Sequence, residues 1–157
     1  MLFTKTCKIG EHVRSPTMSA KIKALAGAFL ILAAVSMHAK ESNDAVLARF
    51  SKVGAFAFGG IGFAGVTSEG EKDFRNILAS SSAQAQFEQL YATGNLQAKA
   101  YALVGIRRLD MRRYNELSTP LRDISQPVTV FRGCIMSHEL FSSLLKSIDD
   151  GAYDVKK

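Results

Sequence analysis

The chain has 157 residues, of which 47% are hydrophobic, and a formal net charge of +6. Residues 1–39 contain five lysines and arginines against one glutamate, a net +4, which leaves +2 for residues 40–157. The basic character of the whole chain is therefore no argument for nucleic-acid binding, and no nucleic-acid partner is expected.

The N-terminal region contains an apolar run over residues 24–35, which follows Lys21 and Lys23. The run ends in Ser36-Met37-His38-Ala39, and this order of basic lead, short apolar run and small-residue exit is typical of a secretory signal peptide. The alternative is an uncleaved anchor, although a bilayer core needs about 20 apolar residues. We therefore predict a signal peptide over residues 1–39.

The length of the region before the apolar run predicts that translation starts at Met18, so that residues 1–17 are not translated. Residues 40–157 are then a single exported domain, located in the periplasm or outside the cell. This domain is long enough for one hydrophobic core. No stable membrane span is expected after cleavage of the signal.

Removal of the signal would take away Cys7 and leave Cys134 as a lone thiol. Burial of this thiol as a small hydrophobe is favoured by its apolar neighbours Val128, Val130, Phe131 and Ile135. The alternative is a dimer joined by an intermolecular disulfide through Cys134. His138 would be the remaining histidine, so the domain lacks a ligand set of zinc type. Neither a metal nor a cofactor is expected.

The first elements after the signal are predicted from caps and apolar spacing. A helix over residues 45–53 ends at Gly54, and a segment rich in glycine and phenylalanine covers residues 55–66. Ser68 and Glu71 have the spacing of a capping box, so a second helix begins there. Its apolar residues recur at the i, i+3, i+4 spacing that buries one helical face.

The second half of the chain continues with further helices. A third helix ends near residues 94–95, and the next one, residues 96–109, is apolar almost all round, as in a central buried helix. Asp110 caps a fifth helix that stops at Pro120. Residues 127–133 are rich in β-branched side chains, so they form a strand that pairs with part of residues 55–66, or a buried coil. Ser137 is expected to cap a last helix that ends near residue 149.

Together these elements predict a mainly α fold. It consists of about five to six short helices in antiparallel hairpins, with one short strand or extended segment near residues 128–132. The run Ala98-Lys99-Ala100-Tyr101-Ala102-Leu103-Val104-Gly105-Ile106, with Asp110 and Tyr114, resembles one helical hairpin of a tetratricopeptide or HEAT array. Residues 59–74, followed by this apolar helix, resemble short exported bacterial proteins of unknown function, of the microcin-cluster accessory type. That resemblance implies no activity and no site.

The glycine- and phenylalanine-rich segment contains Gly60, Gly62 and Gly65 at the spacing of a dinucleotide-binding loop. The helix does not open at the third glycine and no acidic residue follows near positions 80–85, so cofactor binding is not expected. One hypothesis places the segment in the core, packed on the apolar helix. A second exposes it as a partner-binding loop, with the candidate residues Phe58, Ile61 and Phe63.

Four arginines, Arg107, Arg108, Arg112 and Arg113, fall within seven residues. One interpretation is a patch for an anion or an acidic protein partner. The other interpretation is a solvated helix end. There, cations interact favourably with the helix dipole at its C-terminus, and Arg112 pairs with Glu116.

The sequence contains no catalytic constellation. Ser137, His138 and Glu139 are neighbours in sequence, whereas a triad converges in space, and the acidic residues 69–73 are explained by helix capping. We therefore predict an accessory domain that functions through protein–protein interaction. The alternative is a small-ligand binder or hydrolase-type enzyme with a pocket under residues 55–66.

Overall fold

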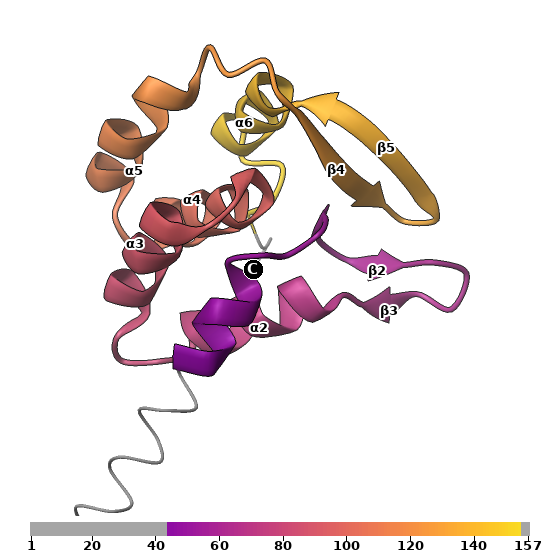
Figure 1. Ribbon diagram of the computed structural model, residues 1–157, viewed down its shortest axis with the longest axis horizontal. Coiled ribbons are helices and arrows are strands. Elements are labelled where there is room, and N and C mark those ends of the chain that lie inside the picture. Colours follow the sequence, from indigo (N-terminus) through magenta and orange to yellow (C-terminus); the bar gives the residue numbers. More distant parts are fainter. Residues whose placement is uncertain (1–43, 155–157) are drawn as a thin grey trace, which may run out of the picture. The chain divides into compact units, whose positions relative to one another are not determined.

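Short strands, a run of helices, a β-hairpin and a last helix follow one another along residues 44–154, the part of the chain that the computed structural model describes (Figure 1). The predicted signal peptide and its cleavage site lie outside these residues, so both stay predictions. In the described part, no helix combines the length and apolar character that crossing a membrane requires.

The described elements begin with a short helix over residues 44–50. The strands that follow it are two residues long, namely β1 (Phe56–Ala57), β2 (Gly60–Ile61) and β3 (Val66–Thr67). The next helices follow one another with short joints, namely α2 (Glu69–Leu78), α3 (Ala83–Thr93), α4 (Leu96–Leu109) and α5 (Met111–Ser118). A 3-10 turn (Thr119–Leu121) leads to the last elements, namely β4 (Pro127–Arg132), β5 (Ile135–Leu140) and α6 (Phe141–Asp149).

The prediction of a mainly α fold is wrong, because the described residues form a mixed α/β structure with two small sheets. β4 is the central strand of the larger sheet, with β1 parallel on one side and β5 antiparallel on the other. β2 and β3 form a separate antiparallel hairpin. Pairing of this kind satisfies the backbone N–H and C=O groups of an extended segment that would otherwise be buried without partners.

The last helix begins later than predicted. Ser137 lies in β5, opposite Val130 of β4, and helix α6 starts at Phe141. The serine does not cap a helix because its backbone pairs with β4. The apolar stripe of α6 is nevertheless placed as its spacing predicts, with its large side chains buried.

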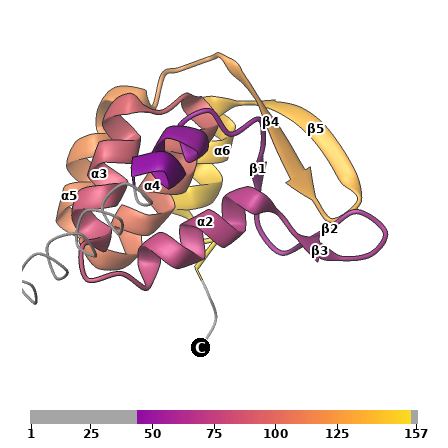
Figure 2. The ribbon, with the colours of Figure 1, turned by 60° about the horizontal axis from the view of Figure 1, so that its bottom comes forward.

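Helix α4 is the centre of the packing, as its apolar sequence predicts. Residues 100–106 are buried without interruption, and α4 packs against α2, α3, α5, α6, β1 and β4 (Figures 1 and 2). Gly105 permits the closest approach, since a Cβ there would lie 2.5 Å from the ring of Phe87 on α3. The close contact between α3 and α4 therefore requires glycine at position 105.

The hydroxyl of Tyr101 on α4 connects this helix to the sheet. It accepts a hydrogen bond from Ala57 N at 2.9 Å and donates one to Ala57 O at 2.8 Å. Burial raises the pKa of Tyr101 above its ordinary value, which keeps the hydroxyl protonated and able to donate. Both backbone polar groups of Ala57 are thereby satisfied by one side chain.

Substitution Gly105→Ala should lower the free energy of unfolding by about 1–3 kcal/mol, because the methyl group overpacks the Phe87 ring. This loss should exceed the gain in helix propensity of about 1 kcal/mol. The control is Gly54→Ala, where a Cβ meets nothing within 4 Å and the expected change is within about 0.5 kcal/mol. Urea unfolding followed by circular dichroism measures both. Equal effects of the two variants would contradict the packing argument.

Substitution Tyr101→Phe should cost about 1–3 kcal/mol, because it leaves the buried Ala57 N–H without a partner. The matched control is Tyr91→Phe, which removes a hydrogen bond to Leu117 O in a half-exposed position that water can reach. We expect a smaller loss there. Denaturant unfolding of both variants provides the comparison, and a neutral Tyr101→Phe variant would refute the role of this hydroxyl.

Candidate functional site

The glycine- and phenylalanine-rich segment divides into an inner and an outer half. Phe56 is buried and Phe58 is half-buried, and both stack against the Tyr101 ring, with centroids 4.7 and 5.2 Å away. Phe63, by contrast, is fully exposed at 106% of its reference area. The core hypothesis therefore describes the first half of the segment, and the exposed-loop hypothesis describes Phe63.

The outer half joins a second hairpin. Gly62 N donates a hydrogen bond to Gly133 O at 3.1 Å, which brings the β2–β3 connection against the β4–β5 turn. Both glycines have positive φ, 68° and 61°, a conformation that a side chain would strain. Two segments 70 residues apart in the sequence therefore meet at their turns.

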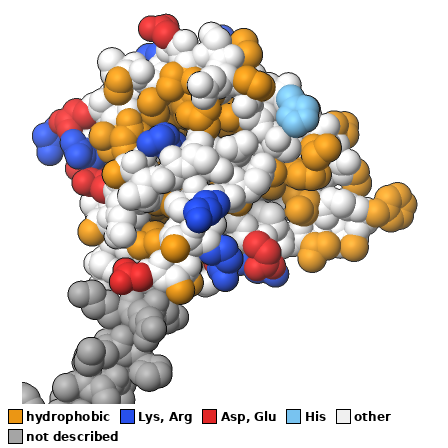
Figure 3. Space-filling view, viewed as in Figure 1, with side chains coloured by type: hydrophobic (Ala, Val, Ile, Leu, Met, Phe, Trp, Pro, Cys, Tyr) orange, Lys and Arg blue, Asp and Glu red, His pale blue; other side chains and the backbone are white. Residues whose placement is uncertain are grey.

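Both hairpins expose apolar side chains within four residues of this hydrogen bond. We call Phe63, Val66, Ile135 and Met136 the two-hairpin surface; the last three are 56%, 70% and 58% exposed. Figure 3 shows hydrophobic side chains gathered over this end of the described residues. Residues 55–68 and 133–137 contain no charged side chain. An uncharged apolar cluster of this kind marks an interaction site more often than singly scattered apolar residues do.

Cys134 lies in the middle of this region and is exposed, so the expectation that it is buried is wrong. Arg132 pairs with Ile135, which makes Gly133 and Cys134 the two-residue turn of the hairpin. A turn projects beyond the sheet, and this places the thiol in solvent in spite of its apolar neighbours. The disulfide-linked dimer stays a prediction. His138, on β5, is also exposed and lies 3.2 Å from the Thr129 hydroxyl.

Two of the four clustered arginines form ion pairs at the surface. Arg112 is 81% exposed and pairs with Glu116 at 3.3 Å. Arg113 contacts Glu88 at 3.2 Å and Glu116 at 3.0 Å. Exposed pairs of this kind contribute little to stability. The guanidinium groups of Arg112 and Arg113 are therefore already paired with carboxylates of the chain itself.

The other two arginines, on α4, turn towards the C-terminal part of the described chain. Arg107 pairs with Asp154 and lies over the Tyr114 ring, 5.9 Å from its centroid. Arg108 donates from Nη2 to Tyr153 O and lies over the Phe74 ring. The structure therefore does not assemble the four arginines into one patch, because successive side chains on a helix point in different directions.

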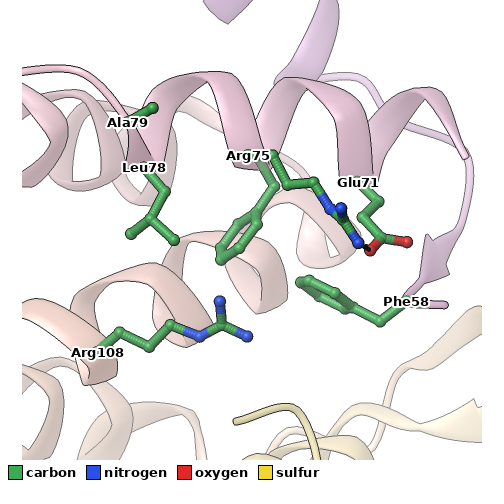
Figure 4. Close-up of a pocket in the computed structure, with 7 residues that line it drawn as sticks. Phe58, Glu71, Arg75, Leu78, Ala79 and Arg108 are labelled. Carbon is green, nitrogen blue, oxygen red and sulfur yellow. Dashed lines mark hydrogen bonds and ion pairs between the residues drawn. The ribbon is translucent and has the colours of Figure 1, made fainter. Parts of the chain in front are cut away.

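A cavity of about 460 Å³ lies between α2 and the end of α4 (Figure 4). Its lining combines apolar side chains with one carboxylate and two guanidinium groups, from Phe58, Glu71, Phe74, Arg75, Leu78, Ala79 and Arg108. Phe58 and Arg108 were candidates from the sequence, whereas Arg75 and Phe74 were not. The signal that could have found Arg75 is its i+4 spacing from Glu71 on one helix face.

The carboxylate of Glu71 is fully engaged. Oε2 accepts from Gly59 N at 2.8 Å, and Oε1 accepts from Arg75 Nη2 at 2.6 Å. The side chain is only 4% exposed. Its backbone N–H donates to Ser68 Oγ at 3.0 Å, as the predicted cap requires. Glu71 therefore holds the start of the β2–β3 hairpin and offers no free base for catalysis.

Arg108 has a different environment at the other side of the cavity. Its guanidinium carbon lies 5.0 Å from the Phe74 ring centroid, a cation–π distance. Within residues 44–154 it forms no ion pair, and its Nε is buried without a hydrogen-bond partner. Burial lowers the pKa of Arg108 from its ordinary value, and Asp154 opposes this shift. Since arginine stays protonated in proteins, a charge remains at the cavity.

Comparison of the chain with protein-family models, with curated proteins and with solved structures found no match in any of the three. The resemblance to short exported bacterial proteins therefore stays a prediction. Among the described residues, no group of three histidine, cysteine, aspartate or glutamate side chains is placed to hold a metal ion. A function for this chain is therefore inferred from the geometry of the two-hairpin surface and of the cavity.

The exposed thiol provides a direct check of the two-hairpin geometry. In a Cys7→Ser background, Cys134 of the folded chain should react with a thiol reagent such as dithionitrobenzoate about as fast as in denaturant, because its side chain is exposed. Absorbance at the reagent's visible band gives the rate. Protection by more than tenfold in the native state would show that the turn is covered.

Proposed function

We propose that residues 44–154 are an interaction domain that docks onto an apolar protein partner through the two-hairpin surface. The observation that carries the proposal is the exposure of Phe63 and Ile135 on two hairpins that are joined by a hydrogen bond near both residues. An exposed aromatic side chain is a frequent anchor of protein interfaces. The proposed setting is the periplasm or the cell exterior, where the predicted signal peptide would deliver the domain.

The chemistry of the surface favours a protein over a membrane as the partner. Interfacial membrane binding uses basic side chains beside an apolar face, whereas residues 53–68 contain no lysine or arginine. The protruding two-hairpin surface is also more complementary in shape to a concave binding site than to a second copy of the same surface. We therefore infer a separate partner with an uncharged, apolar hollow, and not a second copy of the chain.

Crosslinking from the native thiol tests this proposal. Benzophenone maleimide attached to Cys134, in a Cys7→Ser background expressed in the native host, should give one adduct of defined mass upon irradiation. The control carries Cys134→Ser and Met111→Cys, because Met111 is 48% exposed and lies on α5, outside the two-hairpin surface. We expect the adduct from position 134 and not from position 111.

Binding of the purified partner then measures the contribution of the surface. Phe63→Ser should weaken this binding at least tenfold, whereas the equally polar change Met111→Ser should alter it less than twofold. Circular dichroism confirms that both variants fold, which is expected because both side chains are exposed. An adduct with the mass of two copies, adducts only with lipid, or equal effects of the two variants would contradict the proposal.

A further inference from the structure

The cavity beside α2 combines apolar walls with a cation, Arg108, that forms no ion pair with any carboxylate of residues 44–154. The rings of Phe58 and Phe74 are packed edge to face, with centroids 5.0 Å apart, and form one wall together with Leu78. Figure 4 shows Phe58 and Arg108 pointing into the same space from opposite sides. A volume of about 460 Å³ falls in the range of roughly 300–1,000 Å³ that is usual for small-ligand pockets.

The charges at the cavity add up to one excess cation. Glu71 and Arg75 neutralise each other through a contact of 2.6 Å. Within residues 44–154, the hydrogen bond of Arg108 goes to a backbone carbonyl, that of Tyr153, and the nearby Asp154 forms its ion pair with Arg107. Its neighbour Arg107 shows the usual arrangement, in which a half-buried guanidinium is paired with a carboxylate, here Asp154. A part-buried charge without a direct ion pair is costly, and an anionic ligand that contacts it would relieve that cost.

We propose that this cavity binds a small organic monocarboxylate with an apolar body. The carboxylate would contact the Arg108 guanidinium, and the apolar body would lie against Phe58, Phe74 and Leu78. A cation that is unpaired among the described residues matches a single negative charge, and the apolar lining disfavours a highly hydrated dianion such as phosphate. The site shares no residue with the two-hairpin surface, so the inference goes beyond the proposed function and can fail independently of it.

Octanoate is a suitable probe, with octan-1-ol as its uncharged counterpart. Titration of the full chain, followed by isothermal calorimetry, should show saturable binding of one octanoate per chain in the millimolar range or tighter. Octanol should bind at least tenfold more weakly, because it lacks the charge that Arg108 would pair with. Phe63→Ser should leave octanoate binding unchanged, which separates this result from the outcome for the protein partner.

Substitutions in the cavity test whether Arg108 contacts the carboxylate of octanoate. Arg108→Met should weaken octanoate binding at least tenfold and remove the preference over octanol, whereas Arg108→Lys should keep that preference. Arg112→Met is the matched control and should alter binding less than twofold, because Arg112 lies at the surface away from the cavity. Ala79 lies at the exposed rim of the cavity, so Ala79→Trp should fill the cavity and weaken the binding of both octanoate and octanol.

Three results would overturn the inference. These are the absence of saturable octanoate binding in the millimolar range, equal binding of octanoate and octanol by the unmodified chain, and unchanged octanoate binding by a folded Arg108→Met variant. Thermal unfolding establishes whether each variant is folded. If Arg108→Met does not fold, unchanged octanoate binding by Ala79→Trp overturns the inference in its place.

Discussion

The rest of the structure depends on the buried hydroxyl of Tyr101, which bonds to both backbone polar groups of Ala57. These two bonds attach β1 to the middle of α4, and β1 in turn pairs with β4. Gly70 of α2 leaves room for the same hydroxyl, since a Cβ there would lie 2.7 Å from it. Helix α2, helix α4 and the larger sheet therefore meet at one side chain whose polar atoms are satisfied inside the core.

The fixed position of β1 explains why the following segment has two different surroundings. Directly after β1, Phe58 turns inward and borders the cavity, and Glu71 holds the next residue, Gly59. Beyond that point the chain runs out to Gly62, which is bonded to the other hairpin. A single glycine-rich segment thus contributes an aromatic wall to a cavity and an exposed ring, Phe63, to a surface. The two proposed interactions use different ends of the same segment.

The helices could be predicted because their signals are local. Ser68 and Asp110 cap α2 and α5 with the side-chain bonds that their spacing predicts. Strand β5 could not be predicted in this way. Its sequence, Ile-Met-Ser-His-Glu-Leu, lacks strong β-propensity and contains a serine typical of a helix cap, and only pairing with β4 makes it a strand. The exposure of Cys134 follows from that same pairing, which turns residues 133–134 into a hairpin turn.

The sequence by itself determined helices α2 to α5, the caps at Ser68 and Asp110 and the apolar character of α4, because these signals lie within one or two turns of the chain. Only the tertiary structure decided that Phe58 and Arg108, 50 residues apart, border one cavity, and that the hairpins carrying Phe63 and Ile135 meet. It also separated the four arginines, of which three pair with the chain's own carboxylates. Such encounters depend on long-range packing and strand pairing, for which the linear order of residues contains no periodic signal.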